Sequence, residues 1–87
     1  MEKITVVISD PIGLHARPAS KIVSVSSKFK SDIKIVTSAA TANAKSIMNI
    51  MSLAVKQGQE ISIVAEGEDK KEAIETLKAT MVENNLI

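Results

Sequence analysis

Alternation of hydrophobic and polar residues predicts four β-strands. In residues 3–8, every second position is a β-branched aliphatic residue, which is typical of a strand with one buried face. The same period of two recurs in residues 33–37 and 60–65, and a shorter alternating segment at residues 40–44 predicts one further strand. The inward-facing positions of these strands are expected to be Ile4, Val6, Ile8, Ile33, Ile35, Ile61 and Ile63.

Helical spacing of apolar residues predicts three helices between these strands. The first should run from Ala16 to about Lys28, with small or apolar residues recurring every three to four positions. Ser46 is a suitable N-cap for a second helix that ends at Gly58. In the third, Asp69 and the glutamate three residues later resemble a capping box. Its buried face should consist of Ala73, Ile74, Leu77 and Met81.

The predicted order of elements is βαββαβα. Four short strands and three amphipathic helices favour an α+β fold, an open-faced sandwich of two layers. We expect a mostly antiparallel four-stranded sheet with three helices on one face. The 87 residues should form a single domain, residues 1–87, because no linker, repeat or low-complexity segment interrupts them.

Composition argues against several classes of partner. Eleven basic and ten acidic residues give a formal net charge of +1, so no strong field attracts nucleic acid or an anionic membrane. The single aromatic residue, Phe29, cannot form a stacking platform for bases. Cysteine is absent, and the apolar run Ile4–Ile8 is too short for a signal-peptide core or a membrane span. We therefore expect a cytoplasmic protein with no nucleic-acid or membrane partner.

The only histidine, His15, is the first candidate for chemistry. Residues 10–13 have the composition of a type I turn, and Pro18 is acceptable in a helix only within its first turn. His15 should therefore lie at the N-terminus of the first helix, where free backbone N–H groups favour an anion. Arg17 adds a planar cation that suits phosphate.

A neutral imidazole at such a site can act as a nucleophile and hold a phosphoryl group as a phosphoramidate. The residues alone leave open a simpler interpretation, in which His15 is a surface or capping residue. A metal site would lack a second histidine and any cysteine. A serine hydrolase would lack a recognisable nucleophile elbow. The chain thus offers an anion site that contains a nucleophile, without naming the phosphoryl donor.

Two segments, GLHARPAS at Gly13–Ser20 and KSIMNIMSL at Lys45–Leu53, resemble a known family at its spacing. Together with the βαββαβα order, they are similar to the histidine-containing phosphocarrier (HPr) family of the bacterial phosphoenolpyruvate-dependent sugar phosphotransferase system. The low-GC Gram-positive type is the most similar. This resemblance implies that His15 accepts phosphate on Nδ1 from enzyme I and passes it to enzyme IIA domains during sugar uptake. Ala16, Arg17 and Pro18 would bind the phosphate.

The resemblance further implies a carrier that is itself phosphorylated, not an enzyme, with no cofactor and no metal. Ser46 would be a regulatory phosphorylation site for a serine kinase/phosphorylase, with a catabolite-control repressor as a further partner. Without the resemblance, helix capping alone explains Ser46. A carrier that visits several partners is expected to be a monomer. The alternative is a non-transferring regulatory or small-anion-binding module of the same fold.

The second helix is more apolar than a surface helix requires. Its apolar positions span roughly 220° of the circumference, so either part of this surface is exposed or loops cover it. Ile50, Leu53 and Ala54 are expected on the core side. The family uses this helix and the first one to dock partners, which implies the docking residues Leu14, Ser20, Ile47, Met48 and Met51.

The sequence departs from the family at a few positions in the turn after the second strand and in the second helix. Many relatives have glycine in the turn where this chain has Ser38-Ala39-Ala40, and glycine at the positions of Asn49 and Ala54. We expect these departures to affect the turn and the end of the second helix.

Overall fold

A computed structural model describes residues 1–87, and its element order is the predicted βαββαβα. The strand predicted at residues 40–44 is present but spans only three residues. The elements are β1 (Glu2–Val7), α1 (Ala16–Ser26), β2 (Asp32–Val36), β3 (Thr41–Asn43), α2 (Ile47–Ser52), β4 (Glu60–Glu66) and α3 (Lys70–Glu83).

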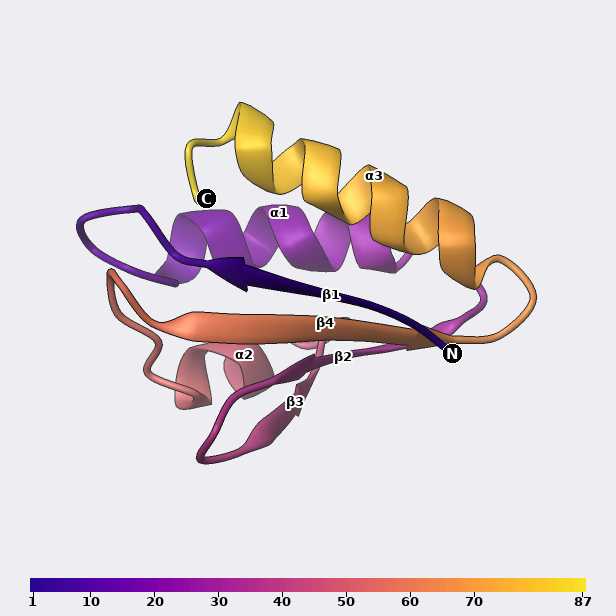
Figure 1. The fold of residues 1–87 in the computed structure, drawn as a ribbon, viewed down its shortest axis with the longest axis horizontal. Coiled ribbons are helices and arrows are strands. Elements are labelled where there is room, and N and C mark those ends of the chain that lie inside the picture. Colours follow the sequence, from indigo (N-terminus) through magenta and orange to yellow (C-terminus); the bar gives the residue numbers. More distant parts are fainter.

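The four strands form one sheet in the order β1-β4-β2-β3, and every neighbouring pair is antiparallel. The register aligns Ile63 of β4 with Ile4 of β1 on one side and with Ile35 of β2 on the other. Helices α1 and α3 lie side by side over the sheet, and α2 lies next to β3 (Figure 1). The predicted α+β open-faced sandwich is therefore confirmed.

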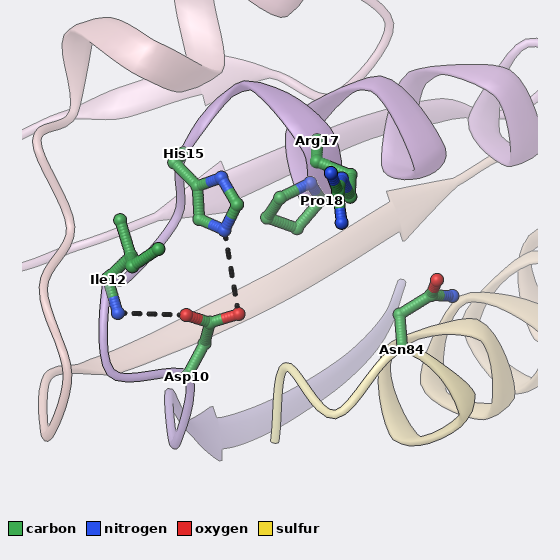
Figure 2. Close-up of a pocket in the computed structure, with 6 residues that line it drawn as sticks. All are labelled: Asp10, Ile12, His15, Arg17, Pro18 and Asn84. Carbon is green, nitrogen blue, oxygen red and sulfur yellow. Dashed lines mark hydrogen bonds and ion pairs between the residues drawn. The ribbon is translucent and has the colours of Figure 1, made fainter.

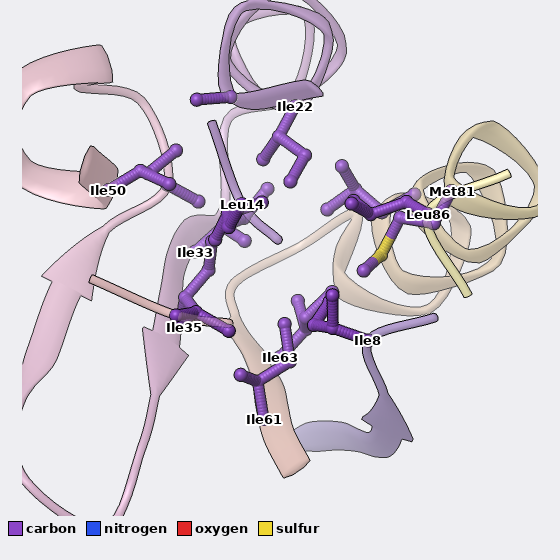
Figure 3. Close-up of a cluster of buried hydrophobic side chains, with 14 of the residues drawn as sticks. Ile8, Leu14, Ile22, Ile33, Ile35, Ile50, Ile61, Ile63, Met81 and Leu86 are labelled. Carbon is purple, nitrogen blue, oxygen red and sulfur yellow. The ribbon is translucent and has the colours of Figure 1, made fainter. Parts of the chain in front are cut away.

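The core lies between the sheet and the helices, and every helix contributes to it (Figure 3). The sheet supplies a row of isoleucines from alternate positions, as the alternation predicted. The opposite face carries exposed or half-buried side chains such as Lys34 and Ser62, so only one face of the sheet is covered. The largest buried core residues are Ile8, Ile22, Ile33, Ile35, Ile50, Ile61, Ile63, Leu77, Met81 and Leu86.

Two helices end earlier than their patterns predicted. Helix α1 ends at Ser26 rather than near Lys28. Helix α2 ends at Ser52, not at Gly58, and the residue after its C-cap, Ala54, has a φ of +53°. A residue in the left-handed region ends the helical hydrogen bonding, which is why glycine is common at this position in proteins. This turn also leaves Ala54 exposed, so the expectation that Ala54 belongs to the core side is wrong.

The predicted capping box at Asp69 is also wrong. Asp69 is the N-cap residue of α3, but its side chain makes no capping hydrogen bond. Its carboxylate instead accepts hydrogen bonds from the N–H groups of Lys30 and Ser31, both at 2.9 Å, and from the Ser31 hydroxyl. These donors, the hydroxyl first, lower the pKa of Asp69 to about 2. Asp69 therefore ties the start of α3 to the segment before β2.

The departures in the turn and in α2 have local explanations. Thr37 closes the turn after β2, because its hydroxyl accepts hydrogen bonds from the N–H groups of Ala39 and Ala40. Neither alanine needs a positive φ there. The Asn49 side chain accepts a hydrogen bond from the N–H of Asn43, which joins α2 to β3. Among these departures from the family, only Ala54 occupies a conformation that favours glycine.

Candidate functional site

The loop between β1 and α1 begins with the predicted turn. The N–H of Gly13 donates to the carbonyl of Asp10 at 2.9 Å, as a turn over residues 10–13 requires. The Asp10 side chain adds a second bond, because its Oδ1 accepts from the N–H of Ile12 at 2.8 Å. Gly13 has a φ of +89°, which only glycine adopts without strain. The turn is thus held by both the main chain and a side chain.

Two segments distant in sequence hold this loop in place. The N–H of Leu14 donates to the Val55 carbonyl at 2.9 Å, and the N–H of Ser9 donates to the Leu86 carbonyl at 2.8 Å. Gly13 is packed so tightly that a Cβ there would lie 2.3 Å from the Val55 oxygen. The segment after α2 and the C-terminal segment therefore fix the backbone that leads into α1.

His15 is the N-cap residue of α1, in extended conformation with φ −90° and ψ −172°. Its side chain makes no capping hydrogen bond, and 31% of its surface is exposed. The ring Nε2 lies 3.6 Å from Oδ2 of Asp10, and the Nδ1 edge faces away from that carboxylate (Figure 2). Pro18 is buried within the first turn of the helix, so the predicted start of α1 at His15 is confirmed.

The first turn of α1 presents unpaired donors beside the imidazole. No hydrogen bond engages the N–H groups of Ala16 and Arg17, and the Arg17 guanidinium makes neither an ion pair nor a hydrogen bond. The helix dipole adds partial positive charge at this end. The imidazole nucleophile thus adjoins an arrangement suited to a phosphoryl group, with free donors and an exposed cation.

A shallow hollow of about 230 Å³ brings these groups together (Figure 2). Sequence reasoning assigned Asp10 only to the turn and did not assign Asn84 to the site at all. Asp10 could have been suspected, since a turn that ends in glycine just before His15 returns the chain toward its own start. Asn84 is the C-cap of α3 and gives no local signal. The lining residues are Asp10, Ile12, His15, Arg17, Pro18 and Asn84.

Ser46 is the N-cap of α2, as predicted, and its hydroxyl accepts a hydrogen bond from the N–H of Asn49 at 3.2 Å. Of the apolar residues on this helix, Ile50 is fully buried and Leu53 is half-buried. Ile47, Met48 and Met51 form the outer face of α2, with exposed fractions of 39%, 84% and 44%. Loops therefore do not cover the excess apolar surface of this helix.

The remaining docking candidates differ in accessibility. Ser20 is exposed on α1. Leu14 is only 4% exposed and belongs to the hydrophobic core, so the expectation that it contacts partners is wrong. Its backbone bond to Val55 turns the side chain inward, where burial of an apolar residue is favourable.

No group of three or more His, Cys, Asp and Glu side chains is arranged to hold a metal ion. No helix combines the length and the hydropathy that a membrane span requires.

Comparison with known proteins gives a consistent result. The family model for the PTS HPr component phosphorylation site matches residues 2–83. The phosphocarrier protein HPr of Mycoplasma pneumoniae is 49% identical over all of both chains. A solved histidine-containing phosphocarrier protein of Mycoplasma is 46% identical, with a TM-score of 0.97 and coverage of 99% and 98%. An HPr dimer from Thermoanaerobacter tengcongensis is 44% identical, with a TM-score of 0.76 and 98% coverage of each chain.

These matches and the site define a carrier of phosphoryl groups, and they favour that function over a non-transferring or small-anion-binding module. The chain belongs to the HPr family of phosphocarrier proteins of the phosphotransferase system.

Proposed function

We propose that His15 is the residue that carries the phosphoryl group, on Nδ1, from enzyme I to the enzyme IIA domains of sugar transporters. The observation that carries this proposal is an exposed imidazole at a helix N-terminus whose first N–H groups are unpaired. Its Nε2 faces a carboxylate, so Nδ1 is the nitrogen open to a phosphoryl donor. The resulting phosphoramidate is reactive enough to be passed on.

The neighbouring residues would stabilise the transferred group. The N–H groups of Ala16 and Arg17 are free to donate hydrogen bonds to phosphate oxygens, and Pro18 keeps the first turn in place without offering an N–H of its own. The unpaired guanidinium of Arg17 can reach charge that develops during transfer. Because the phosphoryl group is passed on to a partner in each cycle, the chain acts as a carrier and not as an enzyme by itself.

The outer face of α2 and Ser20 are proposed as the docking surface for these partners. Methionine side chains are flexible and polarisable, which suits a surface that contacts several proteins. Met48 is the most exposed of the large apolar residues in the chain, at 84%. We expect Met48→Asp to weaken binding to enzyme I with little change in thermal stability, which separates docking from folding.

Ser46 is proposed as a regulatory phosphorylation site, with a serine kinase/phosphorylase and a catabolite-control repressor as further partners. A phosphate there would add about −1.5 to −2 charges at a helix N-terminus that tolerates them. The same charge would adjoin Ile47 and Met48, where a partner must desolvate apolar surface. Phosphorylation would thus impair docking without rearranging the domain. Ser46→Asp should fold at least as well as Ser46→Ala, yet it should receive phosphate on His15 more slowly than wild type.

The proposal also includes a single domain over residues 1–87, a monomeric carrier and a cytoplasmic location. A hydrophobic core shared by the three helices and by strands β1, β2 and β4 supports the single domain. The absence of cysteine is compatible with a reducing compartment. Since one similar structure is an HPr dimer, the oligomeric state needs direct measurement by light scattering across a range of concentrations.

The decisive experiment is incubation with enzyme I and phosphoenolpyruvate, followed by mass spectrometry and an acid-lability test. Wild type should gain one acid-labile phosphate, and folded His15→Ala should gain none. Arg17→Ala should be modified more slowly, because its nucleophile is intact but charge stabilisation is lost. An acid-labile phosphate on His15→Ala would disprove the assignment of His15.

A further inference from the structure

The two carboxylate oxygens of Asp10 have different partners. Oδ1 accepts a hydrogen bond from the N–H of Ile12 at 2.8 Å, and Oδ2 lies 3.6 Å from Nε2 of His15 (Figure 2). The Asp10 side chain is only 18% exposed. Because the bond to Ile12 belongs to the turn itself, the turn orients the carboxylate toward the ring independently of the state of His15.

We propose that Asp10 is a positioning residue that holds the proton of neutral His15 on Nε2 and thereby leaves the lone pair on Nδ1. A carboxylate only accepts hydrogen bonds, so Nε2 is favoured beside it as N–H. In a neutral imidazole, a proton on one nitrogen leaves the other unprotonated. This inference rests on the proposed role of His15 and adds the residue that selects its reactive nitrogen.

The same contact would assist transfer. The Nδ1 lone pair forms the new N–P bond while the bond between phosphorus and the donor breaks, and that electron pair leaves with the donor. The proton stays on Nε2, so the ring gains positive charge during the step. The Asp10 carboxylate lies beside that charge and stabilises it, as an acceptor does for the imidazolium of a catalytic triad. Onward transfer reverses these changes and returns the same tautomer.

Asp10→Asn gives a sharp test, because the turn determines how the new amide is oriented. The N–H of Ile12 needs an acceptor, so the amide oxygen should remain there and the NH₂ group should face Nε2. A donor at that place favours an unprotonated Nε2 and moves the proton to Nδ1. ¹⁵N NMR of the isolated protein, at a pH where imidazole is neutral, reports the tautomer directly. The initial rate of phosphorylation by enzyme I should fall about tenfold or more.

Asp32→Asn is the matched control, since it removes the same charge from an exposed residue of β2 that pairs with Lys34. It should keep the wild-type tautomer and rate. If Asp10→Asn does not fold in a thermal unfolding assay, Asp10→Ser replaces it, because a hydroxyl can also accept from Ile12. With Nε2 then unpartnered, a mixture of tautomers is expected.

The inference would be overturned if NMR showed the His15 proton of the wild type on Nδ1. It would also be overturned if Asp10→Asn, or Asp10→Ser used in its place, kept the wild-type tautomer, whatever its rate of phosphorylation. A changed tautomer with an unchanged rate would also overturn it. By contrast, wild type that receives no phosphate on His15 would overturn the proposed function. The two failures are distinguishable because the NMR measurement needs no enzyme I.

Discussion

Gly13 and Gly58 have nearly the same backbone conformation in different surroundings, which makes them a matched pair. Their φ angles are +89° and +88°. A Cβ on Gly58 would meet no atom within 4 Å, whereas on Gly13 it would lie 2.3 Å from the Val55 oxygen and 2.8 Å from the Lys56 Cα. Replacing each glycine by alanine therefore adds the same conformational strain at both positions, and a steric conflict at only one.

The magnitudes follow from these surroundings. Positive φ should cost an alanine about 1–2 kcal/mol at either position. At Gly13, the Leu14 to Val55 hydrogen bond must also yield, with a loss of about 0.5–1.5 kcal/mol. Overpacking adds about 1–3 kcal/mol. Gly13→Ala should thus lose about 2.5–6.5 kcal/mol, a large share of the roughly 5–15 kcal/mol that stabilises a typical domain.

Urea unfolding at equilibrium measures both losses, and enzyme I assays of the folded fraction measure transfer. Gly58→Ala should lower the unfolding midpoint slightly and leave His15 phosphorylation unchanged. Gly13→Ala should lower it several times more and slow phosphorylation, because the displaced loop carries His15. Equal losses for the two variants would refute the claim that contact with Val55 fixes the loop.

Three other substitutions test features found only in the structure. Ala54→Gly should raise stability by about 0.5–1 kcal/mol in thermal unfolding, since relief of left-handed strain outweighs the added freedom of the unfolded chain. Ser26→Ala should raise the stability by about 1 kcal/mol in the same assay, because the buried hydroxyl of Ser26 has no hydrogen-bond partner. The pKa of Asp69 in the folded protein is about 2, below its ordinary value of 3.8. The ionised carboxylate therefore contributes stability above pH 3.8, and this contribution is lost as the pH falls through 2. Asp69→Asn should therefore lower the melting temperature at neutral pH, with a difference from wild type that shrinks over that interval.

Each of the three has an outcome that would contradict it. A lower melting temperature for Ala54→Gly would mean that alanine is unstrained at this helix end. Destabilisation by Ser26→Ala would reveal a partner for the hydroxyl. A pH-independent difference for Asp69→Asn would show that ionisation of the carboxylate does not matter to the contact with Ser31.

The elements that the sequence predicted well are those decided by local pattern. Alternating isoleucines specify which face of β2 and β4 is buried, because side chains on a strand point to opposite faces. The start of α1 followed from Pro18, which tolerates only the first turn of a helix. His15 was therefore located correctly before any tertiary contact was known, and Ser46 was located as a cap by the same kind of local chemistry.

The errors lie where a distant segment decides the outcome. Asp69 gives up its predicted cap because Lys30 and Ser31 offer it three donors. Leu14 lies in a loop with no periodic pattern to place it, yet the bond to Val55 turns it into the core. The Asp10 carboxylate faces the His15 ring because of the way the turn folds back. No periodicity in the sequence indicates the distance between these two side chains.

The site separates into a framework and a set of reactive groups. The loop that carries His15 is fixed by main-chain bonds to Val55 and Leu86, from segments that lie far along the chain. The Arg17 side chain has no partner within the protein, and the His15 ring has only the Asp10 carboxylate. Changes to the framework should therefore alter stability and transfer together, whereas changes to either side chain should alter transfer alone. This division follows from the chemistry of a carrier, whose reactive groups must stay available to each partner in turn.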